Sequence, residues 1–151
     1  MKVHRSFAAT GAAAIVVAAA LFAGSSSALA GAASPRSGSV YVTKECTKYN
    51  GAAGDFCTIT SSNIPWIRAG MKVVYANAFN NGLDTDVVVS AGHGSKLYGH
   101  VTLDATGQSG TVTFDGGTGK FRTLHGSADV AYLPGGPTGY DYTWTGTYSF
   151  G

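Results

Sequence analysis

After residue 30, hydrophobic and polar positions alternate in short runs that are rich in Val, Thr and Tyr. Alternation with period two is typical of strands that bury one face, and no apolar pattern with helical spacing persists over three turns in this part of the sequence. The runs predict eight strands, at residues 39–46, 56–61, 71–77, 86–91, 96–105, 110–114, 123–133 and 139–150. The sequence therefore predicts an all-β domain.

Strong turn signals separate the predicted strands: Asn50-Gly51, Asn81-Gly82, Asp-Gly-Gly at 115–117 and Pro-Gly-Gly-Pro at 134–137. Each of them supplies a residue that tolerates positive φ. Consecutive strands joined by short turns form an antiparallel meander, which at this size closes into a barrel or folds into a sandwich.

The first 30 residues have a different pattern. Basic residues at positions 2 and 5 precede an almost wholly apolar run at 7–24, and Ala-Leu-Ala at 28–30 fits the cleavage site of a secretory signal peptide. We expect cleavage after Ala30 and secretion of the rest of the chain. The alternative is an uncleaved membrane anchor, because the apolar run is close to the roughly 20 residues that span a bilayer.

Cleavage changes the charge of the protein. Two of the ten Lys and Arg residues lie before residue 31, so eight basic residues balance eight acidic ones in the remainder. This balance offers no basic surface for nucleic acid or an anionic membrane, and we expect neither as a partner of the secreted protein. Residues 31–38, rich in Ala, Ser and Gly, are expected to form a flexible leader before a single domain at 39–151.

The sequence contains two cysteines, Cys46 and Cys57. Disulfides persist in secreted proteins, and closing this loop would stabilise the fold by roughly 3 kcal/mol. A metal pair or a reactive thiol is the alternative, but neither cysteine has a nearby histidine or further ligands at short spacing. We predict a disulfide, with no metal and no cofactor.

The last predicted strand has one aromatic face and one polar face. Asp141 belongs to the polar face, together with the Thr and Ser residues that follow it at every second position. The aromatic face is either core or part of the wall of an apolar ligand cavity, because Tyr and Trp combine a flat apolar surface with one hydrogen-bonding group. The candidate ligand-binding residues on that face are Tyr140, Tyr142, Trp144 and Tyr148.

Residues 114–126, Phe-Asp-Gly-Gly-Thr-Gly-Lys-Phe-Arg-Thr-Leu-His-Gly, resemble the Gly-Gly-Thr-Gly-Lys-Phe signature of dirigent proteins, which share a barrel fold with allene oxide cyclases. Residues 99–150 are similar to bacterial secreted relatives of that superfamily. The resemblance implies an eight-stranded antiparallel barrel with a mostly apolar interior, often assembled into homo-oligomers. Known members cyclise fatty-acid epoxides or steer phenolic radical coupling, and the resemblance therefore implies a small apolar or phenolic ligand.

The matching residues of the signature indicate structure more than chemistry, with glycines for a tight turn and a phenylalanine as an inward anchor. They are Gly116, Gly117, Thr118, Gly119 and Phe121. Plant dirigent proteins commonly have Ala-Arg-Gly shortly after this signature, whereas this chain has Leu124-His125-Gly126. The pocket arginine of the family is thus replaced by His125, which counts against the plant coupling activity.

His125 shares one face of its strand with Ser127 and Asp129. His125 and Asp129 are the candidate catalytic residues, as a general acid or base and its orienting group, although such a set is also typical of a solvated face. Three functions follow as hypotheses: a secreted binder of a small apolar or phenolic molecule, an isomerase or cyclase that uses the same cavity, and a structural or surface-interaction protein with a filled barrel. An interior cavity above about 300 Å³ would favour the first two.

Overall fold

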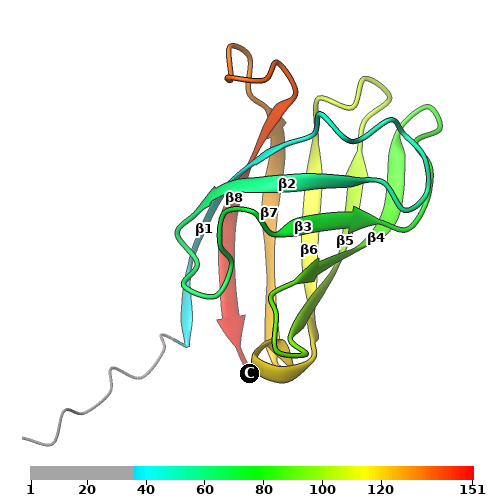
Figure 1. Cartoon of the computed structure of the whole chain (residues 1–151). Helices are drawn as coiled ribbons and strands as arrows, with labels where there is room; N and C mark the ends of the chain where they lie inside the picture. Colours follow the sequence, from blue (N-terminus) through cyan, green and yellow to red (C-terminus); the bar gives the residue numbers. More distant parts are fainter. Residues whose placement is uncertain (1–35) are drawn as a thin grey trace, which may run out of the picture. The chain divides into compact units, whose positions relative to one another are not determined.

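The computed structural model describes residues 36–151, which form a closed barrel of eight antiparallel strands in chain order (Figure 1). The strands are β1 (Ser37–Glu45), β2 (Phe56–Ser62), β3 (Lys72–Tyr75), β4 (Leu83–Ser90), β5 (Lys96–Leu103), β6 (Ser109–Gly117), β7 (Leu124–Tyr132) and β8 (Asp141–Phe150), with a short 3-10 helix η1 (Gly119–Phe121). This confirms the predicted all-β class and the eight-stranded barrel. The predicted signal peptide at 1–30 lies outside the described residues.

Two of the strand boundaries that differ from the prediction have a clear structural cause. β1 begins at Ser37, inside the predicted leader, because Ser37 and Gly38 pair with the end of β8. β4 begins at Leu83, three residues earlier than predicted, because Leu83 and Thr85 both point into the barrel. The buried hydroxyl of Thr85 accepts a hydrogen bond from the backbone N–H of Asn77 (2.7 Å), which satisfies a polar group at an inward position.

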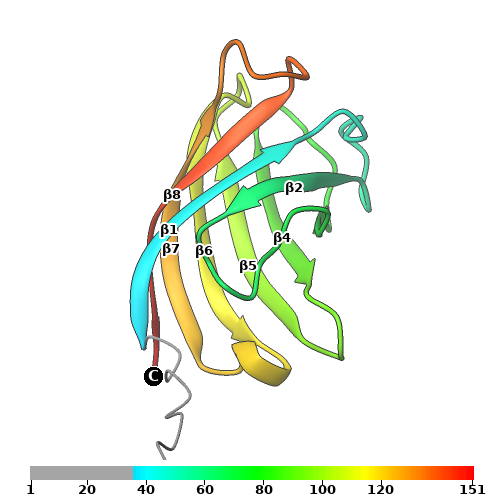
Figure 2. The same ribbon diagram turned by 60° about the vertical axis from the view of Figure 1, so that its left-hand side comes forward.

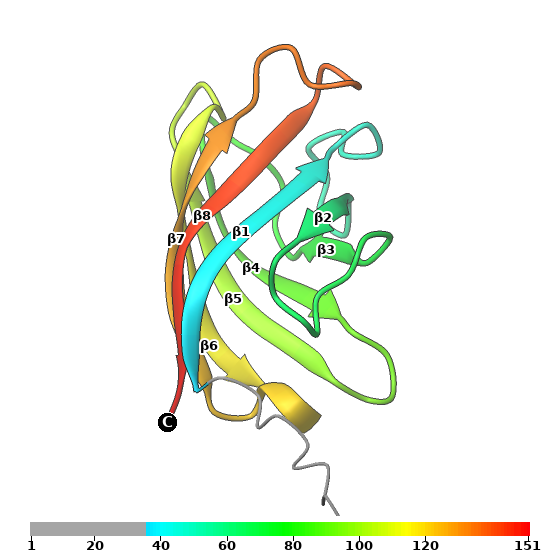
Figure 3. The ribbon, with the colours of Figure 1, turned by 90° about the vertical axis from the view of Figure 1, so that its left-hand side faces the viewer.

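The connections alternate between the two ends of the barrel because each strand reverses direction (Figure 2). The loops 46–55, 76–82, 104–108 and 133–140 lie at one end, which we call the pocket end. The other end, which we call the far end, carries the loops 63–71, 91–95 and 118–123, the start of β1 and the end of β8. β1 and β8 run side by side along their whole length (Figure 3).

Large side chains fill the centre and the far end of the barrel. The ring of Trp144 is fully buried and packs against Phe114 with 5.8 Å between ring centroids. At the far end, the loop residue Trp66 packs edge-on against Tyr148 and Phe150, with centroid distances of 6.2 and 5.1 Å. Branched aliphatic residues occupy most of the remaining inward positions. The interior space left open therefore lies at the pocket end.

The glycine-rich segment joins β6 to η1. Gly116 and Gly119 have positive φ angles of 87° and 59°, and a Cβ atom on Gly117 would lie 1.9 Å from the carbonyl oxygen of Lys96. The hydroxyl of Thr118 accepts the backbone N–H of Lys96 (2.9 Å) and donates to the carbonyl of Gly94 (2.7 Å), and Phe121 is fully buried. These contacts fix the turn against the start of β5.

A disulfide joins Cys46, the first residue after β1, to Cys57 in β2, with the Cα atoms 4.2 Å apart. This confirms the pairing predicted from the sequence. The bridge closes the long loop 46–55 at its base, and both cysteines are buried at the pocket end.

Candidate functional site

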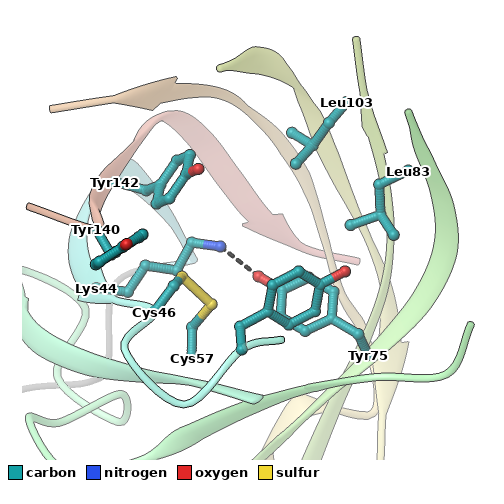
Figure 4. Close-up of a pocket in the computed structure, with 9 residues that line it drawn as sticks. Lys44, Cys46, Cys57, Tyr75, Leu83, Leu103, Tyr140 and Tyr142 are labelled. Atoms are coloured by element: carbon teal, nitrogen blue, oxygen red, sulfur yellow. Dashed lines mark hydrogen bonds between the residues drawn. A yellow bond between two sulfur atoms is a disulfide. The ribbon is translucent and has the colours of Figure 1, made fainter. Parts of the chain in front are cut away.

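A small pocket of about 70 Å³ opens at the pocket end of the barrel (Figure 4). It is far smaller than the cavity of about 300 Å³ that would enclose a typical drug-sized ligand. Its walls come from six strands and two loops: Lys44, Cys46, Tyr49, Cys57, Tyr75, Leu83, Leu103, Tyr140 and Tyr142. A molecule that binds here must either be very small or extend out through the mouth.

Lys44 is the unusual member of this set. It continues the inward alternation of Val40 and Val42 along β1, so the strand geometry directs its side chain into the barrel. Beside it, a β-bulge shifts the register between β1 and β2, and both Thr60 and Ser61 point outward, where they hydrogen-bond to the hydroxyl of Thr43. Bulges commonly re-aim side chains next to functional sites.

The side chain of Lys44 is only 2% exposed. Its Nζ donates a hydrogen bond to Tyr75 Oη and lies 5.1, 5.4 and 5.1 Å from the ring centroids of Tyr75, Tyr142 and Trp144. Within residues 36–151, no carboxylate lies within salt-bridge distance of Nζ. Burial without a counter-charge lowers the pKa of Lys44 to about 7, so a large fraction of the amine is neutral at physiological pH.

Three tyrosines with raised pKa values line the pocket together with Lys44. Burial raises the pKa of Tyr75, and it also raises the pKa values of Tyr49 and Tyr142. The rings of Tyr49 and Tyr75 lie 4.9 Å apart, and the buried Oη of Tyr49 has no hydrogen-bond partner within the described part of the chain. The pocket thus combines aromatic walls with protonated hydroxyls and one neutral or singly charged amine.

Asp141 holds the mouth of the pocket in place. Its Oδ2 accepts hydrogen bonds from the backbone N–H of Thr138 (2.9 Å) and from the Thr138 hydroxyl (2.8 Å). The loop packs so closely that a Cβ atom on Gly136 would lie 2.5 Å from the Asp141 side chain. Asp141 begins the polar face of the last strand, yet the residue is only 3% exposed because it ties the 133–140 loop to β8.

The four predicted aromatic ligand-binding residues lie in different places. Tyr142 lines the pocket, and Trp144 lies directly beneath the Lys44 amine. Tyr140 precedes β8 and is 61% exposed, so its ring forms part of the mouth rather than of an inner wall. Tyr148 is buried at the far end against Trp66 and does not reach the pocket.

The predicted catalytic pair lies outside the barrel. His125 and Asp129 are exposed on the outer face of β7, as is Ser127 between them. Four residues of extended strand separate the two by roughly 13 Å, too far for an acid or base and its orienting group to touch. His125 borders an open surface groove with Gly38 and Tyr148, and neither His125 nor Asp129 lines the Lys44 pocket.

A second polar cluster lies on the outer face of β4 and β5. His100 Nε2 is 2.8 Å from Asp84 and Nδ1 is 2.9 Å from Asp86. The hydrogen bond to Asp86 is the main cause of a raised His100 pKa. Both ring nitrogens are engaged, and between residues 36 and 151 no group of three His, Cys, Asp or Glu side chains has a geometry that could hold a metal ion.

Three residues of the site, Lys44, Tyr49 and Tyr75, were not predicted from the sequence. Lys44 had a readable signal, since it occupies an inward position of the alternating run Val-Tyr-Val-Thr-Lys-Glu-Cys. A charged residue at a buried-face position is rare unless it is paired or functional. Tyr49 and Tyr75 carried no such signal, because a loop and the end of a short strand bring them to the pocket.

Comparison with protein-family models, with curated proteins and with solved structures found no match to this chain. The likeness to dirigent proteins and allene oxide cyclases therefore stays a prediction that rests on residues 99–150, and chiefly on the signature at 114–126. In the part of the chain that the structure describes, no helix is long and apolar enough to cross a membrane.

Proposed function

We propose that this is a secreted protein that binds a small apolar or phenolic molecule at the mouth of the Lys44 pocket. The observation that carries the proposal is a buried amine enclosed by aromatic rings and facing an open cavity. A buried lysine without a carboxylate partner destabilises a fold, and perturbed groups of this kind cluster at functional sites.

The chemistry of the walls favours a ligand with a ring and a hydroxyl group. Tyr140 and Tyr142 offer flat apolar surfaces at the mouth, and Lys44 and Tyr49 offer polar groups deeper in. A phenol hydroxyl can donate to the neutral amine of Lys44, or transfer its proton and pair with the resulting ammonium. The ring itself must remain partly outside, because an engineered cavity that encloses benzene measures roughly 150 Å³.

Titration with 4-methylphenol, followed by amide chemical shifts in NMR spectra, tests the proposal. We expect saturable shifts at Cys46, Tyr49 and Tyr142, and a loss of affinity of about tenfold in Lys44→Met, equal to about 1.4 kcal/mol. Cyclohexanol, which matches the ring in size but is a much weaker acid, should bind less tightly. Lys48→Met, at an exposed lysine on the neighbouring loop, serves as the matched control.

His125→Ala should leave the affinity unchanged, because His125 lies on the outer face of β7. Shifts that spread over the outer surface, or equal affinity in Lys44→Met and the wild type, would contradict the proposal.

The filled centre of the barrel supports a second candidate, a structural or surface-interaction protein without a ligand. The same titration separates the two. No saturable shift with any small phenol or alcohol, in a protein that is folded and disulfide-bonded, would favour the second candidate.

A further inference from the structure

The Lys44 side chain has a chemical property that ligand binding does not require. When neutral, it is a primary amine with a free lone pair. Its Nζ donates to Tyr75 Oη and is otherwise surrounded by the faces of aromatic rings. Lys44 is one of the residues that line the pocket, and its amine points toward Tyr75, so a small molecule that enters comes next to this side chain (Figure 4). Amines in such surroundings are nucleophiles toward carbonyl carbons.

We propose that Lys44 forms an imine with a small aldehyde or ketone that enters the pocket. This inference rests on the proposed binding site and names the chemical class that the site takes. A carbonyl compound of two to four carbons suits a volume of about 70 Å³, and a longer chain or a ring can extend past Tyr140 into solvent.

The condensation balances without any further reactant. The lone pair of Nζ forms the bond to the carbonyl carbon while the π electrons of C=O move to oxygen. One proton passes from nitrogen to that oxygen and gives the carbinolamine, and the second N–H proton leaves with the hydroxyl as water. The products are the imine and one water molecule.

Tyr75 is placed to assist both proton movements. Its Oη is hydrogen-bonded to Nζ, and its raised pKa keeps the hydroxyl protonated and able to donate to the departing oxygen. Tyr75 touches the reacting nitrogen, so it acts as a catalytic residue in this step.

The other lysines of the described chain provide the internal comparison. Lys48, Lys72, Lys96 and Lys120 are all exposed. The lowered pKa of Lys44, about 7, supports faster reaction at this one position.

Reductive trapping of the wild-type protein tests the inference. The protein is incubated at pH 7 with propanal and sodium cyanoborohydride, and the propylated lysines are located by peptide mass spectrometry. We expect Lys44 to be labelled about tenfold faster than the mean of the exposed lysines, with a rate that levels off above about pH 7. Equal labelling of all lysines, or labelling of the exposed lysines alone, would overturn the inference.

Two further measurements separate chemistry from binding. Tyr75→Phe should slow labelling of Lys44 and leave labelling of Lys48 unchanged, and 4-methylphenol should protect Lys44 if both ligands share the pocket. Propan-1-ol, which cannot form an imine, is titrated by NMR in parallel. Pocket shifts with propan-1-ol but no label from propanal would refute the imine and leave the binding site intact, whereas neither signal would refute both.

Discussion

Lys44 and Trp144 lie against each other inside the barrel, with the lysine Nζ 5.1 Å from the ring centroid of the indole. Trp144 is fully buried and Lys44 nearly so, and they come from adjacent strands, β1 and β8. A position with these neighbours is one that a core hydrophobic residue would ordinarily occupy. The amine therefore weakens the fold, and its removal should have a measurable effect on stability.

Lys44→Met should raise the free energy of unfolding at pH 6 by roughly 2 kcal/mol or more, because methionine fills similar space without a charge to desolvate. Urea denaturation with tryptophan fluorescence measures this. Lys48→Met, at an exposed site, should change the stability by less than about 0.5 kcal/mol. A destabilised Lys44→Met at pH 6 would show that the lysine makes favourable contacts that outweigh its desolvation.

The stability of the wild type should rise between about pH 7 and pH 10. The folded protein loses the Lys44 proton near pH 7, whereas the unfolded chain holds it up to the ordinary pKa of 10.5. In this window the unfolded state binds more protons, so the free energy of unfolding increases, by up to about 1.4 kcal/mol per pH unit.

Above about pH 10 the sign reverses. Tyr49, Tyr75 and Tyr142 have raised pKa values, so the folded state keeps protons that the unfolded state releases. Urea midpoints measured from pH 6 to 11 should trace a maximum in the wild type. In Lys44→Met, the rise in stability between about pH 7 and pH 10 should be absent, and the fall above pH 10 should remain. The same rise in both proteins would mean that a group other than Lys44 causes it.

The Cys46–Cys57 bridge should contribute about 3 kcal/mol to stability. We expect the Cys46→Ala, Cys57→Ala double variant to lose about this amount in urea denaturation, and reductant to lower the wild type to the same level. Both cysteines line the Lys44 pocket, so 4-methylphenol should also bind more weakly. Reductant should leave the stability of the double variant unchanged. This control would confirm that the wild type loses stability in reductant through the loss of this bridge alone.

Gly117→Ala should destabilise the barrel by about 2 kcal/mol or more, because its Cβ would meet the backbone of β5 and neither strand can move without breaking the ladder. Gly54→Ala is the control. Gly54 has a positive φ of 86°, but no atom lies within 4 Å of the position that its Cβ would take. The control should cost about 1 kcal/mol, from backbone strain alone. Similar losses of stability in the two variants would mean that the backbone around Gly117 shifts to make room for the new Cβ atom, and would contradict this prediction.

The strands were predictable because alternation and turn residues act locally. Period-two runs and Asn-Gly or Gly-Gly turns were enough to place all eight strands, and the start of β4 was missed where Asp84 and Asp86 flank an inward threonine. A polar residue at an inward position needs a partner from elsewhere in the chain, and here that partner is the backbone of Asn77. Such a hydrogen bond cannot be predicted from the alternation of polar and apolar residues.

The site was less predictable for the same physical reason. The aromatic pattern of the last strand led to Tyr142 and Trp144, but it did not reveal that β8 begins only at Asp141 and leaves Tyr140 in the loop. The pocket itself arises where β1, β3 and the 46–55 loop converge, and Lys44 and Tyr75 are 31 residues apart in sequence. Local periodicity cannot bring such residues together.

The pairing of Ser37 with Ser149 brings the beginning of β1 and the end of β8 to the far end, away from the mouth of the Lys44 pocket. An affinity tag, a fluorescent label or a solid support attached next to either strand end would be held at the opposite side of the barrel. Immobilised protein would therefore present the mouth of the Lys44 pocket to the surrounding solution, a convenient orientation for a sensor of small carbonyl compounds.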